Sequence, residues 1–124
     1  MNSETIQRVI RDKQLASLGD AFVNFIYSLA LTEINGRPEG IKVSDRILSE
    51  AFRQADLRGY LGSRLSRKDL ANGAESLLVE AYRKHLISIE ESVETLTQCS
   101  DGPNAGLSNL LRLVTERLTK QASD

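Results

Sequence analysis

A single long stretch of apolar residues at helical spacing constrains the fold of this chain most strongly. Between residues 14 and 33 apolar side chains recur every three or four positions, and they are dense enough to cover most of the circumference of an α-helix. Such a helix lies at the centre of its domain or is shared between a core and a partner. Residues 35–40, which read Asn-Gly-Arg-Pro-Glu-Gly, have the composition of a loop that ends this helix.

The rest of the chain also has helical periodicity. A short amphipathic turn covers residues 4–11, Ser44 is a candidate N-cap for the next helix, and a further helix begins near residues 66–69. The Ser-x-x-Glu pattern at residues 88–91 predicts a capping box, and a stripe of leucines from Leu107 onward predicts the last helix. Because no segment alternates apolar and polar residues as a half-buried strand does, the sequence predicts an all-α bundle of about six helices.

Size and charge narrow the class of protein. The 124 residues correspond to one domain, residues 1–124. With 16 basic and 17 acidic residues the chain has no overall positive field, so a nucleic-acid role must depend on where the charges lie. A single cysteine excludes an intramolecular disulfide. The most apolar stretch, residues 21–31, is too short to span a membrane and no signal peptide is apparent, so we expect a cytoplasmic protein.

Basic residues are concentrated in the middle of the chain. Between residues 46 and 68 six basic residues accompany two acidic ones, whereas residues 88–101 carry four acidic residues and no basic one. A solvated face explains such a basic group, and a surface that contacts phosphates is the more specific alternative. The candidates for RNA contact are Arg53, Arg58, Arg64, Arg67 and Lys68.

Asp20 is unusual because it lies inside the most apolar helix of the chain. Burying an unpaired carboxylate costs several kcal/mol, so this side chain should face a partner, a metal or a wet cleft. Capping of a neighbouring helix or pairing with an arginine is the purely structural alternative. Gly19 beside it would allow the backbone of another element to approach closely.

A second group of polar residues lies in the helix that begins near residues 66–69. Asn72 and Glu75 are three positions apart and therefore share one helical face. Carboxylates from two helices that converge on one point, with an amide oxygen beside them, suit Mg²⁺, which prefers oxygen ligands and keeps several waters. Such a site can polarise a phosphoryl group and activate water for phosphodiester hydrolysis.

At these positions the sequence resembles the ribonuclease III family. The signature helix of that family reads approximately Asn-Glu-x-Leu-Glu-Phe-Leu-Gly-Asp-Ala-x-Leu, and residues 15–23 of this chain read Leu-Ala-Ser-Leu-Gly-Asp-Ala-Phe-Val. The second family motif, Asp-x-x-Glu-Ala-Leu-Ile, is similar to residues 72–78, Asn-Gly-Ala-Glu-Ser-Leu-Leu. The resemblance covers about residues 14–86 and is closest in type to mini-ribonuclease III and the short archaeal ribonuclease III-like proteins.

The resemblance implies an all-α endonuclease domain that cleaves double-stranded RNA with Mg²⁺, or with Mn²⁺ in its place. It assigns Asp20 and Glu75 as catalytic and metal-binding residues, with Asn72 as a further metal ligand. Two of the four usual acids are replaced, because the signature glutamate falls on Ala16 and the aspartate of the second motif falls on Asn72. Mini-ribonuclease III enzymes also have a small residue at the first position and lack the second aspartate. Like those short members, the chain is expected to lack a double-stranded-RNA-binding domain.

The resemblance also implies a homodimer, and the apolar residues 21–31 offer more apolar surface than one small domain readily covers. The residues predicted at the dimer interface are Phe22, Phe25, Ile26 and Leu29. A core helix in a monomer is the alternative. Two other functions also stay open: a dimer of the same fold that binds duplex RNA without cutting it, and a helical module for protein assembly.

Overall fold

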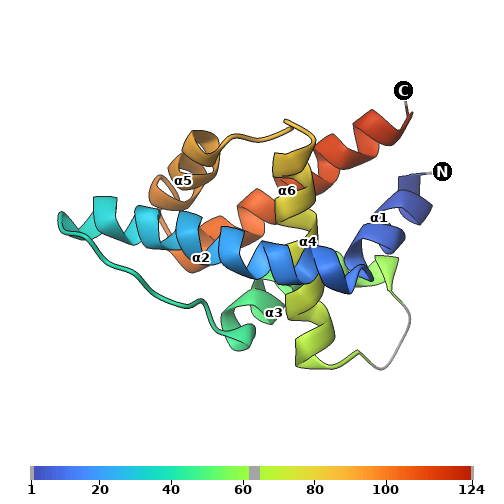
Figure 1. Cartoon of the computed structure of the whole chain (residues 1–124), viewed down its shortest axis with the longest axis horizontal. Coiled ribbons are helices and arrows are strands. Elements are labelled where there is room, and N and C mark those ends of the chain that lie inside the picture. Colours follow the sequence, from blue (N-terminus) through green and yellow to red (C-terminus); the bar gives the residue numbers. More distant parts are fainter. Residues whose placement is uncertain (1, 62–64, 124) are drawn as a thin grey trace.

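The computed structural model describes residues 2–61 and 65–123, and over these residues the chain is helical nearly throughout, with no strand (Figure 1). The prediction of an all-α fold is therefore confirmed. The elements in chain order are α1 (Asn2–Ile10), α2 (Lys13–Asn35), α3 (Asp45–Gln54), the 3₁₀-helix η1 (Arg58–Tyr60), α4 (Arg67–Arg83), α5 (Ile89–Thr97) and α6 (Pro103–Ser123).

Side-chain caps fix where the helices begin. Ser44 accepts a hydrogen bond from the backbone N–H of Ile47 and begins α3, as predicted. Asp12, which the sequence pattern did not single out, caps α2 through the backbone N–H groups of Gln14 and Leu15. Each cap satisfies N–H groups that the first turn of a helix leaves without a partner in the helix itself.

The predicted capping box at residues 88–91 forms only by half. Ser88 accepts from the backbone N–H of Glu91 at 2.9 Å, but the Glu91 carboxylate binds the Arg117 guanidinium through two contacts of 2.7 Å. A bidentate, charge-assisted pair is stronger than a hydrogen bond to a backbone amide, so the carboxylate turns toward α6. The complete box lies at the start of α4, where Ser66 and Asp69 bind each other's backbone N–H groups.

Helix α4 is the central element, and α1, α2, α3 and α6 all pack against it (Figure 1). Ten of its 17 residues are buried, against seven of 23 in α2. Small residues such as Ala71, Gly73 and Ala74 allow neighbouring helices to approach α4 from several sides. The sequence left open whether the most apolar helix is central or shared between a core and a partner, and the structure places α2 across the surface of the bundle, with one face in the core and another exposed.

Residues 21–31 alone are too short to span a membrane, but α2 as a whole could cross one by length and composition alone, since an 18-residue window of it reaches a mean hydropathy of 1.3. The core helix of a globular domain satisfies the same criterion, and seven residues of α2 are buried in the contact with its neighbours.

Candidate active site

The site begins at the point where α2 crosses α4. A Cβ atom on Gly19 would lie 2.1 Å from the backbone carbonyl oxygen of Glu75, so only glycine permits this crossing. The close approach that the sequence suggested for Gly19 is therefore present, and the backbone it admits is that of Glu75. As a result, the residue after Gly19 and the residue opposite it are brought together.

Asp20 and Glu75 carry the two carboxyl groups at this crossing, and their side chains share a hydrogen bond. Glu75 is buried, with 4% of its surface exposed, whereas 40% of the Asp20 side chain is exposed. The structure thus brings together the two acids that the sequence places on separate helices.

The two carboxyl groups titrate differently because their surroundings differ. Burial, and then the hydrogen bond and the charge of Asp20, raise the pKa of Glu75 to about 8. The hydrogen bond from Glu75 and the ammonium group of Lys42 lower the pKa of Asp20 below its usual value. Near neutral pH the pair therefore holds one proton on Glu75 and one negative charge on Asp20.

Asp20 also has partners outside the pair. The Lys42 ammonium lies 3.1 Å from both carboxylate oxygens, and the Asn24 amide donates to Oδ1 at 3.4 Å. The purely structural alternative for Asp20 was an arginine or a helix cap. The structure shows a lysine instead, and its side chain is 73% exposed.

Asp20, Glu75 and Lys42 line an open cleft of about 880 Å³ between α2, α4 and the segment that precedes α3. Asn72 lies in the wall of the same cleft as Glu75, one turn earlier on α4. The complete lining is Lys13, Ala16, Ser17, Asp20, Lys42, Val43, Ser44, Asp45, Ser66, Lys68, Asp69, Asn72 and Glu75. The cleft therefore contains all three of the predicted metal-binding and catalytic residues.

Two further acids of the cleft, Asp45 and Asp69, also have polar partners. Asp45 pairs with Lys68 at 3.6 Å, and Asp69 accepts from the backbone N–H of Ser66 at 3.1 Å. Within residues 2–61 and 65–123 no three histidine, cysteine or acidic side chains are grouped so that they could hold a metal ion. The oxygen donors that the sequence singled out are the Asp20–Glu75 pair and the amide of Asn72, and the carboxylates of Asp45 and Asp69 line the same cleft.

Three lysines line the cleft that contains this carboxylate pair, and the sequence analysis predicted only one of them as an RNA contact. Lys68 lines the cleft, as do Lys13 and Lys42, which the sequence analysis did not single out. Arg53 and Arg67 are exposed but are not among the residues that line the cleft. The backbone of Arg58 lies in η1, and Arg64 lies outside the described residues.

Residues 39–43, here called the strap, run along α2 and carry Lys42 to Asp20. Three polar side chains of α2 bind alternate backbone N–H groups of the strap: Asn24 accepts from Val43 at 2.8 Å, Ser28 from Ile41 at 2.9 Å, and Thr32 from Glu39 at 3.0 Å. Four residues of helix rise about 6 Å, and two extended residues span about 6.6 Å, so the two spacings match. Polar residues at every fourth position of an apolar helix are the sequence signal that would have predicted such a partner.

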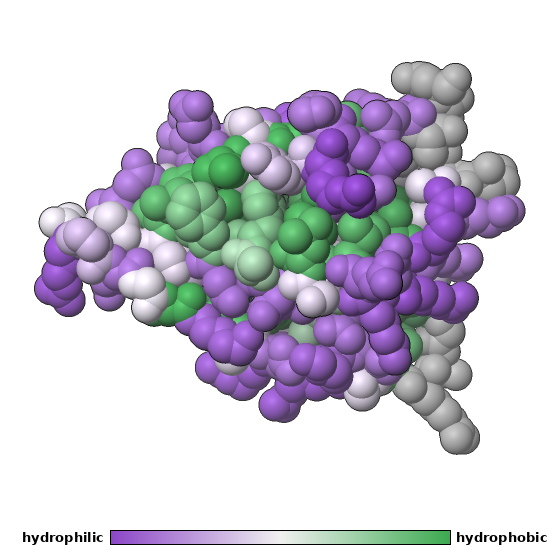
Figure 2. Space-filling view, in the orientation of Figure 1, coloured by the Kyte–Doolittle hydropathy of each residue, from purple (hydrophilic) through white to green (hydrophobic). Residues whose placement is uncertain are grey.

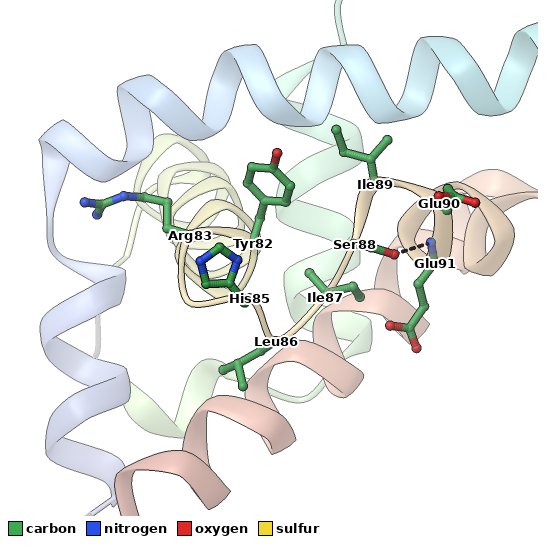
Figure 3. A pocket seen from close by; sticks show the side chains of 9 residues that line it. All are labelled: Tyr82, Arg83, His85, Leu86, Ile87, Ser88, Ile89, Glu90 and Glu91. Carbon is green, nitrogen blue, oxygen red and sulfur yellow. Dashed lines mark hydrogen bonds between the residues drawn. The ribbon is translucent and has the colours of Figure 1, made fainter.

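A second hollow, at the turn between α4 and α5, has a different character (Figure 3). Arg83 and His85 lie at the end of α4, and the side chains of Arg83 and Glu90 point away from each other. The Ser88 hydroxyl caps α5. His85 is exposed. No nucleophile and base face each other among the side chains that line this hollow, so the carboxylate cleft is the stronger candidate site.

The exposed face of α2 belongs to an apolar patch across the front of the molecule (Figure 2). Leu18 and Phe25 are 50% and 52% exposed, and Tyr82 of α4 is 39% exposed. Two of the predicted interface residues are not exposed. Ile26 is fully buried, and Phe22 lies in the core beneath the ring of Tyr82, with the two ring centroids 4.9 Å apart.

Phe25 is thus the one predicted interface residue with a largely exposed side chain, and Leu29 is half-buried. The sequence analysis did not single out two other exposed side chains of the patch. They are Tyr82 and Leu18, which lies two turns before Phe25 on the same face of α2. In a helix that is apolar on most sides, periodicity does not indicate which apolar residues face the core.

The comparisons with known proteins agree with this geometry. No curated protein sequence matches the chain significantly. The family model described as Ribonuclease III matches residues 13–120, which include both helices of the carboxylate pair, the strap and the lysines of the cleft. The chain belongs to the ribonuclease III family.

Proposed function

We propose that the protein is a metal-dependent endoribonuclease that hydrolyses phosphodiester bonds in double-stranded or structured RNA. The family acts on double-stranded RNA and generally uses a divalent metal. The observation that carries the proposal is the Asp20–Glu75 pair, which lies in an open cleft that Lys13, Lys42 and Lys68 also line. Anionic ligands for a cation thus lie beside cationic groups suited to phosphates.

The donor set fits a hard cation such as Mg²⁺, with Mn²⁺ as a substitute. Mg²⁺ is commonly held by one or two carboxylates together with waters and substrate phosphates, and Asp20, Glu75 and the Asn72 amide are oxygen donors of this kind. When bound, the metal would polarise the phosphoryl group and lower the pKa of a bound water. The proton on Glu75 has to leave first, because an opposite charge nearby favours the ionised carboxylate.

The lysines supply the affinity for RNA in this proposal. Lys13 of α2 and Lys68 of α4 both line the cleft, where their ammonium groups can contact phosphates, Lys68 by exchanging its ion pair with Asp45. RNA duplexes are recognised mostly by shape and backbone contacts, so we expect little sequence preference and binding that weakens as salt rises.

A homodimer is part of the proposal, with the apolar patch as the contact surface. Leu18, Phe25 and Tyr82 are large and exposed, and contiguous exposed apolar surface is typical of an interface. An isologous contact would use the same patch on both copies and would place two clefts in one assembly.

A duplex-RNA-binding dimer without nuclease activity is the second candidate. The observation that favours it is the loss of two acids, since Ala16 and Asn72 line the cleft where the family motifs have carboxylates. Fewer negative ligands weaken the binding of a hard cation. This candidate predicts the same salt-sensitive affinity for duplex RNA, with the RNA left intact.

The variants Asp20→Asn and Glu75→Gln separate these functions. Each replaces a carboxyl group by an amide of the same shape, and Glu94→Gln, at an exposed position of α5, is the matched control. We expect both site variants to bind duplex RNA but to lose cleavage with Mg²⁺ or Mn²⁺, while the control cleaves normally. Cleavage by both site variants would contradict the site assignment. Intact RNA bound by the wild type would favour the second candidate, and no RNA binding would favour a protein-assembly module.

A further inference from the structure

Lys42 differs from the other lysines of the cleft because it forms an ion pair with a member of the carboxylate pair. Its ammonium group donates to both oxygens of Asp20, the exposed member of the carboxylate pair, and a cation bound at this pair would need the same oxygens. Lys42 is therefore a competitor for the ligand that the metal requires.

The strap holds this lysine in place. The backbone N–H groups of Ile41 and Val43, on either side of Lys42, are fixed to Ser28 and Asn24 of α2. Asn24 also donates to Asp20, so one side chain contacts both the strap and the carboxylate. The backbone of Lys42 is thus anchored, while its side chain is 73% exposed and free to turn.

We propose that Lys42 is a substrate-contacting residue with two positions: it binds Asp20 in the cation-free protein, and it contacts a phosphate of bound RNA once a divalent cation has taken Asp20. This inference rests on the proposed function. At equal distance a divalent cation attracts a carboxylate about twice as strongly as an ammonium group does. The displaced ammonium can then contact a phosphate of the RNA backbone.

Such a lysine would offset the missing acids of the site. With Ala16 and Asn72 in place of carboxylates, the cleft has two fewer negative ligands with which to hold additional cations. An ammonium group beside the phosphate stabilises the negative charge that develops during hydrolysis, and it does so without a further metal ligand. An exposed Lys–Asp pair that served the fold alone would contribute little to stability, so removing Lys42 should leave the protein folded.

The test compares Lys42→Ala with the wild type, with Lys42→Arg and with Lys120→Ala. Lys120 is an exposed lysine of α6 paired with Glu116, so its loss changes the net charge equally but leaves the cleft intact. Mn²⁺ affinity of the RNA-free protein is measured by titration calorimetry, and kcat and KM are measured on an RNA duplex.

We expect Lys42→Ala to bind Mn²⁺ about two- to fivefold more tightly, because an exposed ion pair no longer competes. We also expect its kcat to fall about 10- to 100-fold with a smaller change in KM. Lys42→Arg should keep the wild-type affinity for Mn²⁺ and part of the activity, and Lys120→Ala should match the wild type in both.

Opposite results overturn the inference. Unchanged or weaker Mn²⁺ binding by Lys42→Ala would show that Lys42 does not compete for Asp20, and an unchanged kcat would show that it does not act on the phosphate. If the wild type cut no RNA while Lys42→Ala still bound Mn²⁺ more tightly, the nuclease function would fail, and with it the phosphate contact, but the competition for Asp20 would stand.

Discussion

The Cβ position of Gly19 lies 2.1 Å from the backbone carbonyl oxygen of Glu75, so the close approach of α2 to α4 at this point is also the contact that assembles the candidate site. Asp20 follows Gly19 directly in the chain, and Glu75 contributes both the carbonyl oxygen and the buried carboxyl group. The packing of the two helices and the spacing of the two acids are therefore set by one interaction.

Replacing Gly19 by alanine should move α2 away from α4 and, as a consequence, Asp20 away from Glu75. The added methyl group meets backbone atoms, which cannot rotate away, so we expect a loss of about 3 kcal/mol in unfolding free energy, at the upper end for overpacked cores. Urea denaturation measures this loss. Gly40→Ala is the matched control, because a Cβ atom there meets no atom within 4 Å. Equal stability of the two variants would contradict the close crossing.

The raised pKa of Glu75 predicts how stability depends on pH without metal. Below pH 4.5 the group is protonated in both the folded and the unfolded chain, whereas between pH 4.5 and about 8 only the folded chain holds the proton. Ionisation therefore favours the unfolded state, and stability should fall as pH rises through this range, by at most about 1.4 kcal/mol per pH unit for one proton.

Denaturation in EDTA at several pH values tests this dependence on Glu75. Its surroundings also include Asp20, Asp45 and Lys68, so the comparison is made with Glu75→Gln, which leaves those three groups in place. The variant should show a flatter profile between pH 5 and pH 8. Identical profiles for the variant and the wild type would mean that Glu75 titrates normally.

The bonds between α2 and the strap predict a local effect of removing one hydroxyl group. Ser28→Ala deletes the acceptor of the Ile41 amide, so hydrogen exchange at Ile41 should accelerate by up to about tenfold, the equivalent of one hydrogen bond. Thr95→Ala is the control, because the Thr95 hydroxyl bonds within its own helix. Exchange at Ile41 that responded no more to Ser28→Ala than to Thr95→Ala would argue against the strap.

The proposed dimer can be tested with two apolar residues on opposite sides of α2. Phe25 and Ile34 are 52% and 49% exposed, and nine positions turn a helix by about half a revolution, so only Phe25 faces the patch. We expect Phe25→Asp to be monomeric at micromolar concentration and Ile34→Asp to remain dimeric in sedimentation velocity. A wild-type protein that is itself monomeric would contradict the proposed dimer.

The sequence was sufficient for the features that depend on local chemistry. Helical periodicity identified the elements, Ser44 identified the start of α3, and the glycine beside Asp20 indicated a close contact. Asn72 and Glu75 share a helical face, and both line the cleft. These predictions succeed because capping, periodicity and the small volume of glycine act within a few residues of the chain.

The features that the sequence did not predict depend on tertiary packing. Lys42 reaches Asp20 across 22 positions of the chain, and only the path of the strap brings the two together. The depth of Ile26 and the exposure of Leu18 depend on how α2 is rotated against α4, which a helix apolar on most sides leaves undetermined. Glu91 does not complete the predicted capping box because its carboxylate binds Arg117 of another helix, which is a stronger partner than a backbone amide.

Incubation of the purified protein with a perfect RNA duplex, with and without Mg²⁺, shows whether the Asp20–Glu75 cleft is a nuclease site. We expect cleavage that requires the metal and that is lost in Asp20→Asn. A duplex that is bound and stays intact at all concentrations of Mg²⁺ and Mn²⁺, or one that is cut equally well by Asp20→Asn, would contradict it.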